Sequence, residues 1–152
     1  MKVKEIMSTN PVTCSSQDDL AAVTLRMWNE DCGVLPVVDD GRVVGVITDR
    51  DICMALTFKG ARPSKVTVAD VIGGHQLFSC SPDDGVADVL KIMGERQVHR
   101  LPVVENGELQ GMLSMNDVAL AAHEAGGSED WPTFGEVIGA MQSICAHRPL
   151  PA

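Results

Sequence analysis

The sequence predicts an α/β fold of the α+β type, in which two β-α-β-β-α repeats pack with pseudo-twofold symmetry and a C-terminal helix follows. The main observation is a gap-free match between "LPVVDDGRVVGVITDRDI" at residues 35–52 and "LPVVENGELQGMLSMNDV" at residues 101–118. The match continues towards the N-terminus, where Cys14 aligns with Cys80. A repeat of this length exceeds that of solenoid proteins, so each copy is expected to form a small α/β unit of its own.

Each copy opens with three predicted elements. In the first copy, a short helical segment at residues 4–7 precedes a β-like run, "PVTCSS" at residues 11–16, which ends in turn-forming residues. Apolar residues at helical spacing then predict a helix over residues 18–30. The second copy repeats these elements at residues 69–72, 76–81 and 84–97.

A hairpin and a helix complete each copy. The runs "VLPVV" at residues 34–38 and "RVVGVIT" at residues 42–48 are rich in β-branched residues and are joined through an Asp-Gly turn, which predicts a β-hairpin. A helix is predicted next, over residues 49–58. The second copy has the corresponding strands and helix at residues 100–104, 108–114 and 115–124.

These elements divide the chain into three segments. We expect a first repeat at residues 1–62, a second repeat at residues 63–124, and a linker with a C-terminal helix at residues 125–152. A unit of about 60 residues buries only about 60% of its unfolded surface and is marginally stable by itself. The two copies are therefore expected to pack against each other and to form paired clefts at their junction.

The segment after the second repeat has no counterpart in the first. A Gly-Gly linker leads to Thr133 and Glu136, whose spacing indicates a capping box for a helix that ends near Ala146. Apolar residues recur along this helix at i, i+3, i+4 and i+7 spacing: Phe134, Val137, Ile138, Met141, Ile144 and Cys145. Two arrangements remain open, because this stripe can pack on the repeats or meet a partner subunit.

The composition argues against several classes of function. With 21 acidic and 12 basic residues the net charge is −9, and the basic residues are scattered, which argues against nucleic acid or an anionic membrane as the partner. No apolar run approaches the roughly 18 residues of a membrane span, and the N-terminus does not resemble a signal peptide, so we expect a cytoplasmic protein. The five cysteines contain no C-x-x-C pair, and neither they nor the four histidines predict a metal site.

The Thr48-x-x-Asp51 sequence allows two interpretations. This spacing commonly caps a helix N-terminus, and it recurs at other helix starts in this chain. Here, however, it follows a glycine within a strand, and such a glycine commonly permits close approach by a ligand or by another backbone. A hydroxyl at a helix N-terminus suits a phosphate, and an aspartate one turn later can accept hydrogen bonds from a ribose diol. The aligned residues are Gly45, Thr48 and Asp51 in the first repeat and Gly111, Ser114 and Asp117 in the second.

The pattern h-P-V-V-D/E-x-G-x-h-x-G-h-h-T/S-x-x-D-h, present twice, resembles that of the tandem cystathionine-β-synthase (CBS) domain pair, or Bateman module. The resemblance covers residues 1 to about 124, and the chain is similar to short stand-alone bacterial CBS proteins. It implies a regulatory module and not an enzyme, in agreement with a sequence that lacks Ser-His-Asp, H-E-x-x-H or P-loop spacing. It also implies a homodimer, an unidentified protein target, and an adenosine-containing ligand in the clefts between the copies. The candidate ligands are AMP, ADP or ATP first, and S-adenosylmethionine or NAD after them.

The resemblance further implies a set of binding residues. The hydroxyls of Thr48 and Ser114 correspond to phosphate contacts, the carboxylates of Asp51 and Asp117 to ribose contacts, and the strand glycines lie beside them. The residues that correspond to the base pocket are Val12, Thr13, Phe78 and Ser79. The remaining candidates are Ile47 as an apolar wall for adenine, Arg50 as a cation for phosphate, and Arg100 beside Pro102 as a partial replacement for that cation in the second repeat.

The first repeat is the favoured site, because Asn116 stands in the second repeat where the first has Arg50. The alternative hypothesis is a ligand-free structural or redox-tuned interaction module, in which the clefts stay empty and the aligned Cys14 and Cys80 respond to oxidation. In the simplest interpretation these two cysteines are buried apolar residues that were duplicated with the repeat.

Overall fold

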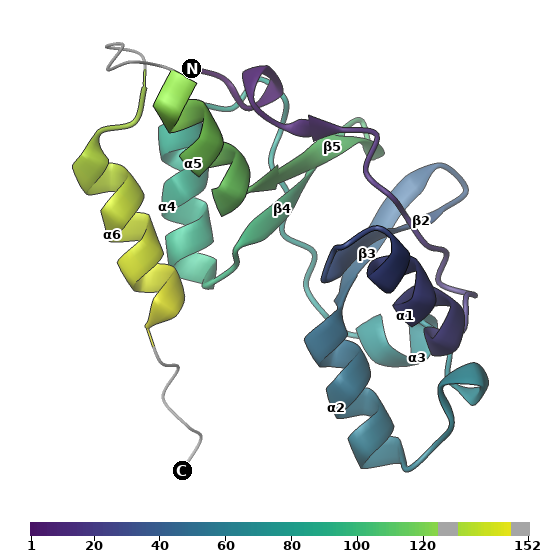
Figure 1. Cartoon of the computed structure of the whole chain (residues 1–152). Helices are drawn as coiled ribbons and strands as arrows, with labels where there is room; N and C mark the ends of the chain where they lie inside the picture. Colours follow the sequence, from purple (N-terminus) through teal and green to yellow (C-terminus); the bar gives the residue numbers. More distant parts are fainter. Residues whose placement is uncertain (125–130, 147–152) are drawn as a thin grey trace. The chain divides into compact units, whose positions relative to one another are not determined.

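The computed structural model describes residues 1–124 and 131–146, which form two compact units (Figure 1). The first-repeat unit contains residues 10–78 and 106–109. Of the described residues, the second-repeat unit contains 1–9, 79–105, 110–124 and 131–146. Each unit combines helices with a small sheet, and the predicted α+β class with two related repeats is confirmed.

The segment that opens each repeat, called here its leading segment, packs in the unit formed by the other repeat. The leading segments are residues 1–9 of the first repeat and residues 68–73 of the second. The 3-10 helix η1 (Val3–Glu5) is held by a hydrogen bond of 3.0 Å from the Val3 N–H to the Asp84 carbonyl. In the same way, the segment that enters helix α3 (Ala69–Ile72) is held by a hydrogen bond of 2.9 Å from the Val68 N–H to the Asp18 carbonyl. The compact units therefore differ from the sequence repeats, since residues 1–9 pack with the second repeat and α3 packs with the first.

The first-repeat unit is built on an antiparallel hairpin. The Asp40-Gly41 turn has positive φ at both residues, 48° and 77°, as a two-residue hairpin turn requires. The strands of the hairpin are β2 (Val34–Asp39) and β3 (Arg42–Thr48). The helices that pack on it are α1 (Leu20–Asn29) and α2 (Asp49–Lys59), and the 3-10 helix η2 (Pro63–Lys65) follows. Their buried apolar residues form one core, in which Leu20, Leu35 and Ile47 are fully or almost fully buried.

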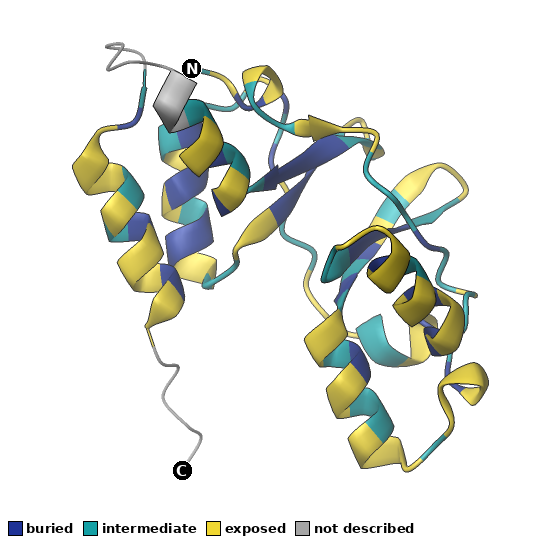
Figure 2. Ribbon diagram, in the orientation of Figure 1, coloured by how far each residue is buried: buried dark blue, intermediate teal, exposed yellow. Residues whose placement is uncertain are grey.

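The second-repeat unit repeats this arrangement and adds one strand. Its hairpin closes through the Asn106-Gly107 turn, where both residues again have positive φ, 52° and 88°, although residues 106–109 are grouped with the first-repeat unit. The elements are α4 (Val86–Arg96), β4 (Arg100–Glu105), β5 (Glu108–Ser114), α5 (Met115–Glu124) and β1 (Ser8–Thr9). The short strand β1 pairs with the outer edge of β5, so that the sheet order is β1-β5-β4. Figure 2 shows the buried residues on β4, β5 and α4.

The β-like runs before the first helix of each repeat are not strands, which corrects the expectation for residues 11–16 and 76–81. Each run makes a single parallel bridge, Cys14 with Val37 and Cys80 with Val103. In the first repeat, pairing ends after Cys14 because the next serine hydroxyl and the amide that follows it both donate to the Asp39 carboxylate, at 2.8 and 3.0 Å. These bonds to the end of β2 stand in place of further backbone pairing, and the chain then turns, with the Asp18 N–H donating to the Ser15 carbonyl at 3.1 Å.

The C-terminal helix α6 (Phe134–Cys145) packs against α4 in the second-repeat unit (Figure 1). Its predicted capping box is confirmed, since Thr133 Oγ1 accepts from the Glu136 N–H at 3.3 Å and the Glu136 carboxylate accepts from the Thr133 N–H at 2.8 Å. The two helices approach closely at Gly94, where an added Cβ would lie 3.2 Å from Ser143 Cβ. Part of the apolar stripe thus packs on the repeats. The predicted Gly-Gly linker lies outside the described residues.

Within the described ranges, no helix has the length and apolar character that crossing a membrane requires.

Candidate functional site

The Thr48-x-x-Asp51 sequence forms a capping box at the junction of β3 and α2. Thr48 Oγ1 accepts a hydrogen bond of 3.1 Å from the Asp51 N–H. In return, the Asp51 carboxylate accepts from the Thr48 N–H at 2.9 Å and from the Thr48 hydroxyl at 2.7 Å, both at Oδ2. The helix-cap interpretation is therefore confirmed. The other two first-turn amides of α2 also have acceptors, since the Asp49 N–H donates to the Gly33 carbonyl at 3.1 Å and the Arg50 N–H donates to Asp49 Oδ1 at 2.7 Å.

The aligned Ser114 and Asp117 make the same capping interaction between β5 and α5. The Asp117 N–H donates to Ser114 Oγ at 3.2 Å, and Asp117 Oδ2 accepts from the Ser114 N–H at 2.7 Å and from its hydroxyl. One further contact has no counterpart in the first repeat: the Ser8 hydroxyl donates to Asp117 Oδ1 at 2.9 Å. By contrast, no residue within the described part of the chain donates a hydrogen bond to Asp51 Oδ1. The Asp117 carboxylate thus accepts one more hydrogen bond from described side chains than the Asp51 carboxylate does.

Protein atoms fill the space beside both strand glycines. A Cβ at Gly45 would lie 2.8 Å from Ile72 Cδ1, and a Cβ at Gly111 would lie 2.7 Å from the Ser8 carbonyl oxygen and 2.9 Å from Met7 Sδ. In each unit the leading segment supplied by the other repeat makes this contact. Of the two reasons for a strand glycine, close approach of other protein is therefore the one that the structure demonstrates.

The other predicted site residues divide between the two units. Val12 and Thr13 are half-buried, and the Thr13 carbonyl accepts a hydrogen bond of 2.6 Å from the Arg26 guanidinium. Ile47 is fully buried in the core of the first-repeat unit, which leaves Val12 as the predicted apolar contact for a base. Arg50 is exposed on the first turn of α2. The first-repeat unit also holds Phe78, which is half-buried.

The predicted residues of the second-repeat unit range from buried to exposed. Pro102 and Gly111 are buried, and Ser114 and Asp117 are half-buried. Ser79 and Arg100 are exposed. Each unit therefore brings its own hydroxyl and carboxylate together at a helix N-terminus.

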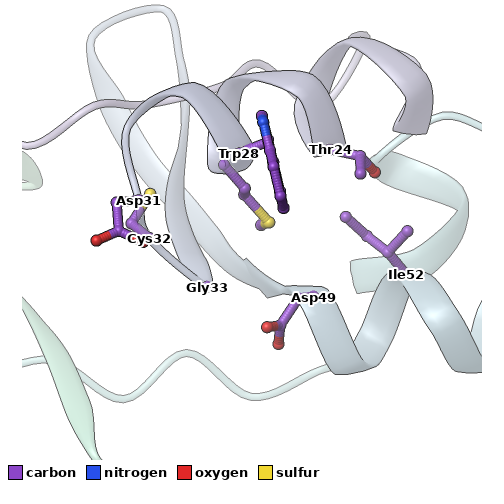
Figure 3. Close-up of a pocket in the computed structure, with 8 residues that line it drawn as sticks. Thr24, Trp28, Asp31, Cys32, Gly33, Asp49 and Ile52 are labelled. Atoms are coloured by element: carbon purple, nitrogen blue, oxygen red, sulfur yellow. The ribbon is translucent and has the colours of Figure 1, made fainter.

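A hollow of about 350 Å³ lies between α1 and α2, and the sequence did not predict it. Figure 3 shows Thr24 and Trp28 entering it from α1, and Asp49 and Ile52 from α2. The Trp28 side chain is 82% exposed. In the sequence, Trp28 counts among the apolar residues that predict the helix, and only the structure shows that the buried residues of α1 are Leu20, Val23 and Met27.

Burial controls the chemistry of the two aligned cysteines. It raises the pKa of the Cys14 thiol to about 12, with the negative charge of Asp18 adding to the effect. It likewise raises the pKa of the Cys80 thiol to about 12. Both thiols are therefore protonated at neutral pH, and protonated thiols are poor nucleophiles. This argues for the simple interpretation of Cys14 and Cys80 as buried apolar residues.

The chain belongs to the CBS domain family. The family model for the CBS domain matches twice, over residues 3–57 and 68–124. These ranges cover both repeats, including the leading segments that exchange between the compact units.

Individual relatives agree with this assignment. The CBS domain-containing protein YhcV of Bacillus subtilis is 31% identical over 128 residues, which are 83% of this chain and 90% of that protein. Hypoxic response protein 1 of Mycobacterium tuberculosis is 28% identical over 76% of this chain and 81% of its own. A crystal structure of Hypoxic Response Protein I with two coordinated zinc ions has a TM-score of 0.72 at 27% identity, covering 79% of this chain and 98% of its own. In the present chain, none of the described His, Cys, Asp and Glu residues form a group of three or more that could hold a metal ion.

A second structure has a bound ligand. The CBS domain pair of protein MJ0100 in complex with 5′-methylthioadenosine and S-adenosyl-L-methionine has a TM-score of 0.72 at 25% identity, covering 82% of this chain and 97% of its own.

Proposed function

We propose that this protein is a regulatory module that binds an adenosine-containing ligand through its first repeat, with AMP, ADP or ATP preferred. The observation that carries the proposal is the half-buried carboxylate of Asp51, whose Oδ1 has no donor among the described residues. The MJ0100 domain pair, whose ligands both contain adenosine, supports the ligand class. The position of the ligand between the two repeats stays a prediction of the family resemblance.

Each part of the ligand has a suitable group in the first repeat. The positive end of the α2 helix dipole favours a phosphate, and the Thr48 hydroxyl can donate to that phosphate in exchange for its hydrogen bond to Asp51 Oδ2. The exposed Arg50 lies on the first turn of this helix and adds a full positive charge. Asp51 Oδ1 can accept hydrogen bonds from the ribose hydroxyls. The half-buried Val12 offers apolar surface for the adenine base, as does the half-buried Phe78, a residue of the second repeat that lies in the first-repeat unit.

Isothermal titration calorimetry of the full chain tests this proposal. AMP, ADP, ATP, S-adenosylmethionine and NAD are titrated in turn into reduced wild-type protein. A dissociation constant near 1 μM corresponds to about −8 kcal/mol. The Asp51→Ala variant is expected to bind at least about tenfold more weakly, because each hydrogen bond to a charged group contributes about 1.5–3 kcal/mol.

Asp70→Ala is the matched control for this variant. The Asp70 carboxylate accepts from the Thr67 N–H at 3.0 Å, as Asp51 accepts from Thr48, and it lies in the same unit but outside the proposed site. Circular dichroism verifies that both variants are folded. Unchanged binding in Asp51→Ala, or an equal loss in Asp70→Ala, would contradict the assignment.

The proposal also includes a change in the protein when the ligand binds. We expect a homodimer whose conformation or assembly changes with the ligand, so that a target protein can detect it. Exposed apolar side chains such as Trp28, Phe58 and Phe134, which are 79–82% exposed, support an association between copies. Light scattering with and without AMP measures this change. The cytoplasmic location expected from the sequence stays a prediction.

The alternative is a structural or redox-tuned interaction module without a ligand. Absence of heat with all five compounds would favour it over the binding function. The raised pKa values of Cys14 and Cys80 oppose its redox form, because a protonated buried thiol is oxidised slowly.

A further inference from the structure

The Asp51 and Asp117 carboxylates accept different numbers of hydrogen bonds from the described residues. The additional donor to Asp117 lies in the N-terminal strand β1. A carboxylate has about four acceptor positions, two on each oxygen. In Asp51, the Thr48 amide and hydroxyl both bind to Oδ2, and the two positions on Oδ1 remain. In Asp117, the Ser114 amide and hydroxyl bind to Oδ2, and the Ser8 hydroxyl takes one position on Oδ1.

The number of remaining acceptor positions affects ligand binding because the ribose of an adenosine ligand carries two neighbouring hydroxyl donors. Asp51 can accept both hydroxyls at once on Oδ1. Asp117 can accept only one unless the Ser8 hydroxyl moves away from it. A vicinal diol therefore gains one hydrogen bond fewer in the second repeat.

The pairing of β1 with β5 keeps Ser8 close to Asp117. Ser8 pairs with Met112 and Thr9 with Gly111. The strands approach so closely that a Cβ at Gly111 would lie 2.7 Å from the Ser8 carbonyl oxygen. Ser8 is thus part of the sheet, and moving its backbone would disrupt that pairing.

The first repeat has no equivalent hydroxyl. The alignment that places residues 4–7 on residues 69–72 places Ser8 on Gly73, and the contacts of Met7 with Gly111 and of Ile72 with Gly45 support this alignment. Gly73 has no side chain that could donate to Asp51. A serine in one leading segment and a glycine in the other thus account for the difference between the two carboxylates.

We propose that Ser8 is a specificity-determining residue, which occupies the Asp117 carboxylate and restricts diol binding to the first repeat. This inference rests on the proposed function. It predicts one strong binding event for AMP in each wild-type chain, and it predicts that this event depends on Asp51 and not on Asp117.

The test is calorimetry of the full chain with AMP and 2′-deoxy-AMP as probes. In the Ser8→Ala variant, a second binding event for AMP is expected to strengthen by about tenfold, which corresponds to about 1.4 kcal/mol. Because the variant frees an acceptor for the second hydroxyl, this event should also come to prefer AMP over 2′-deoxy-AMP. A merely structural effect of Ser8 would not change that preference. Adding Asp117→Ala should abolish the new event and keep the first.

Thr9→Ala is the matched control, since Thr9 lies in the same two-residue strand. It is expected to leave the number of binding events unchanged. If wild-type AMP binding requires Asp51 but Ser8→Ala adds no second event, the role of Ser8 is refuted and the proposed function survives. Two equal events in the wild type, one of them lost in Asp117→Ala, would likewise refute the role of Ser8 alone. If neither wild type nor Ser8→Ala binds AMP, the proposed function fails and the role of Ser8 fails with it.

Discussion

The strand glycines at aligned positions of the two repeats should differ sharply in their tolerance of alanine. Both are buried, and neither has a positive φ, so alanine introduces no backbone strain at either position. At Gly111 the new Cβ would lie 2.7 Å from the backbone carbonyl oxygen of Ser8. At Gly45 it would lie 2.8 Å from Ile72 Cδ1, the far end of a flexible side chain. Gly111→Ala is therefore expected to destabilise the protein much more than Gly45→Ala does.

The expected magnitudes follow from two opposing effects. Alanine in place of glycine stabilises a compatible position by about 0.4–1 kcal/mol, because the unfolded chain loses conformational freedom. Overpacking a core costs about 1–3 kcal/mol when the surroundings must move. At Gly111 the neighbouring strand β1 must shift, which gives a net loss of about 2 kcal/mol. At Gly45 a rotation of the Ile72 side chain relieves the contact, which gives a net change within about 0.5 kcal/mol of zero.

Equilibrium unfolding in urea, followed by circular dichroism, measures both variants against the wild type. The midpoint of Gly111→Ala should fall while the slope of the transition stays the same, as for a change in stability alone. If the two units unfold separately, hydrogen exchange of the β5 amides gives the same comparison locally. Equal stability of the two variants, or a more stable Gly111→Ala, would refute the argument from close approach.

Two further predictions concern ionisable groups. Hydrogen bonds from two lysine ammonium groups of the N-terminal segment lower the pKa of Asp83 from 3.8 to about 2, so the stabilisation that they supply is present above pH 3.8 and is lost as the pH falls towards 2. Hydrogen exchange should show residues 1–9 loosening over this range, and the Asp83→Asn variant should show the loosened state already at neutral pH. Burial raises the pKa of Cys14 and Cys80 to about 12, so in the native protein both should react with a thiol reagent at pH 8 far more slowly than the exposed Cys53 does. Mass spectrometry of the labelled protein checks this order, and rapid labelling of either buried thiol would contradict it.

Sequence by itself determined the features that depend on local patterns. The duplication, both hairpins and the helices after them were predictable, because an Asp-Gly or Asn-Gly turn between two apolar runs and a hydroxyl at a helix start act over a few residues. The capping role of Thr48 was predictable for the same reason. The C-terminal helix was found from its apolar spacing and from the capping box at Thr133.

Only the tertiary structure decided what brings distant residues together. The leading segments pack with the opposite repeat, and this exchange fills the space beside Gly45 and Gly111 with protein. It also allows the Ser8 hydroxyl to donate a hydrogen bond to the Asp117 carboxylate, although the two residues are far apart in the chain. The sequence could pair Thr48 with Ser114 as aligned residues, but no local pattern encodes which carboxylate oxygen a remote side chain will reach. The two sites therefore look alike in sequence and differ in the fold.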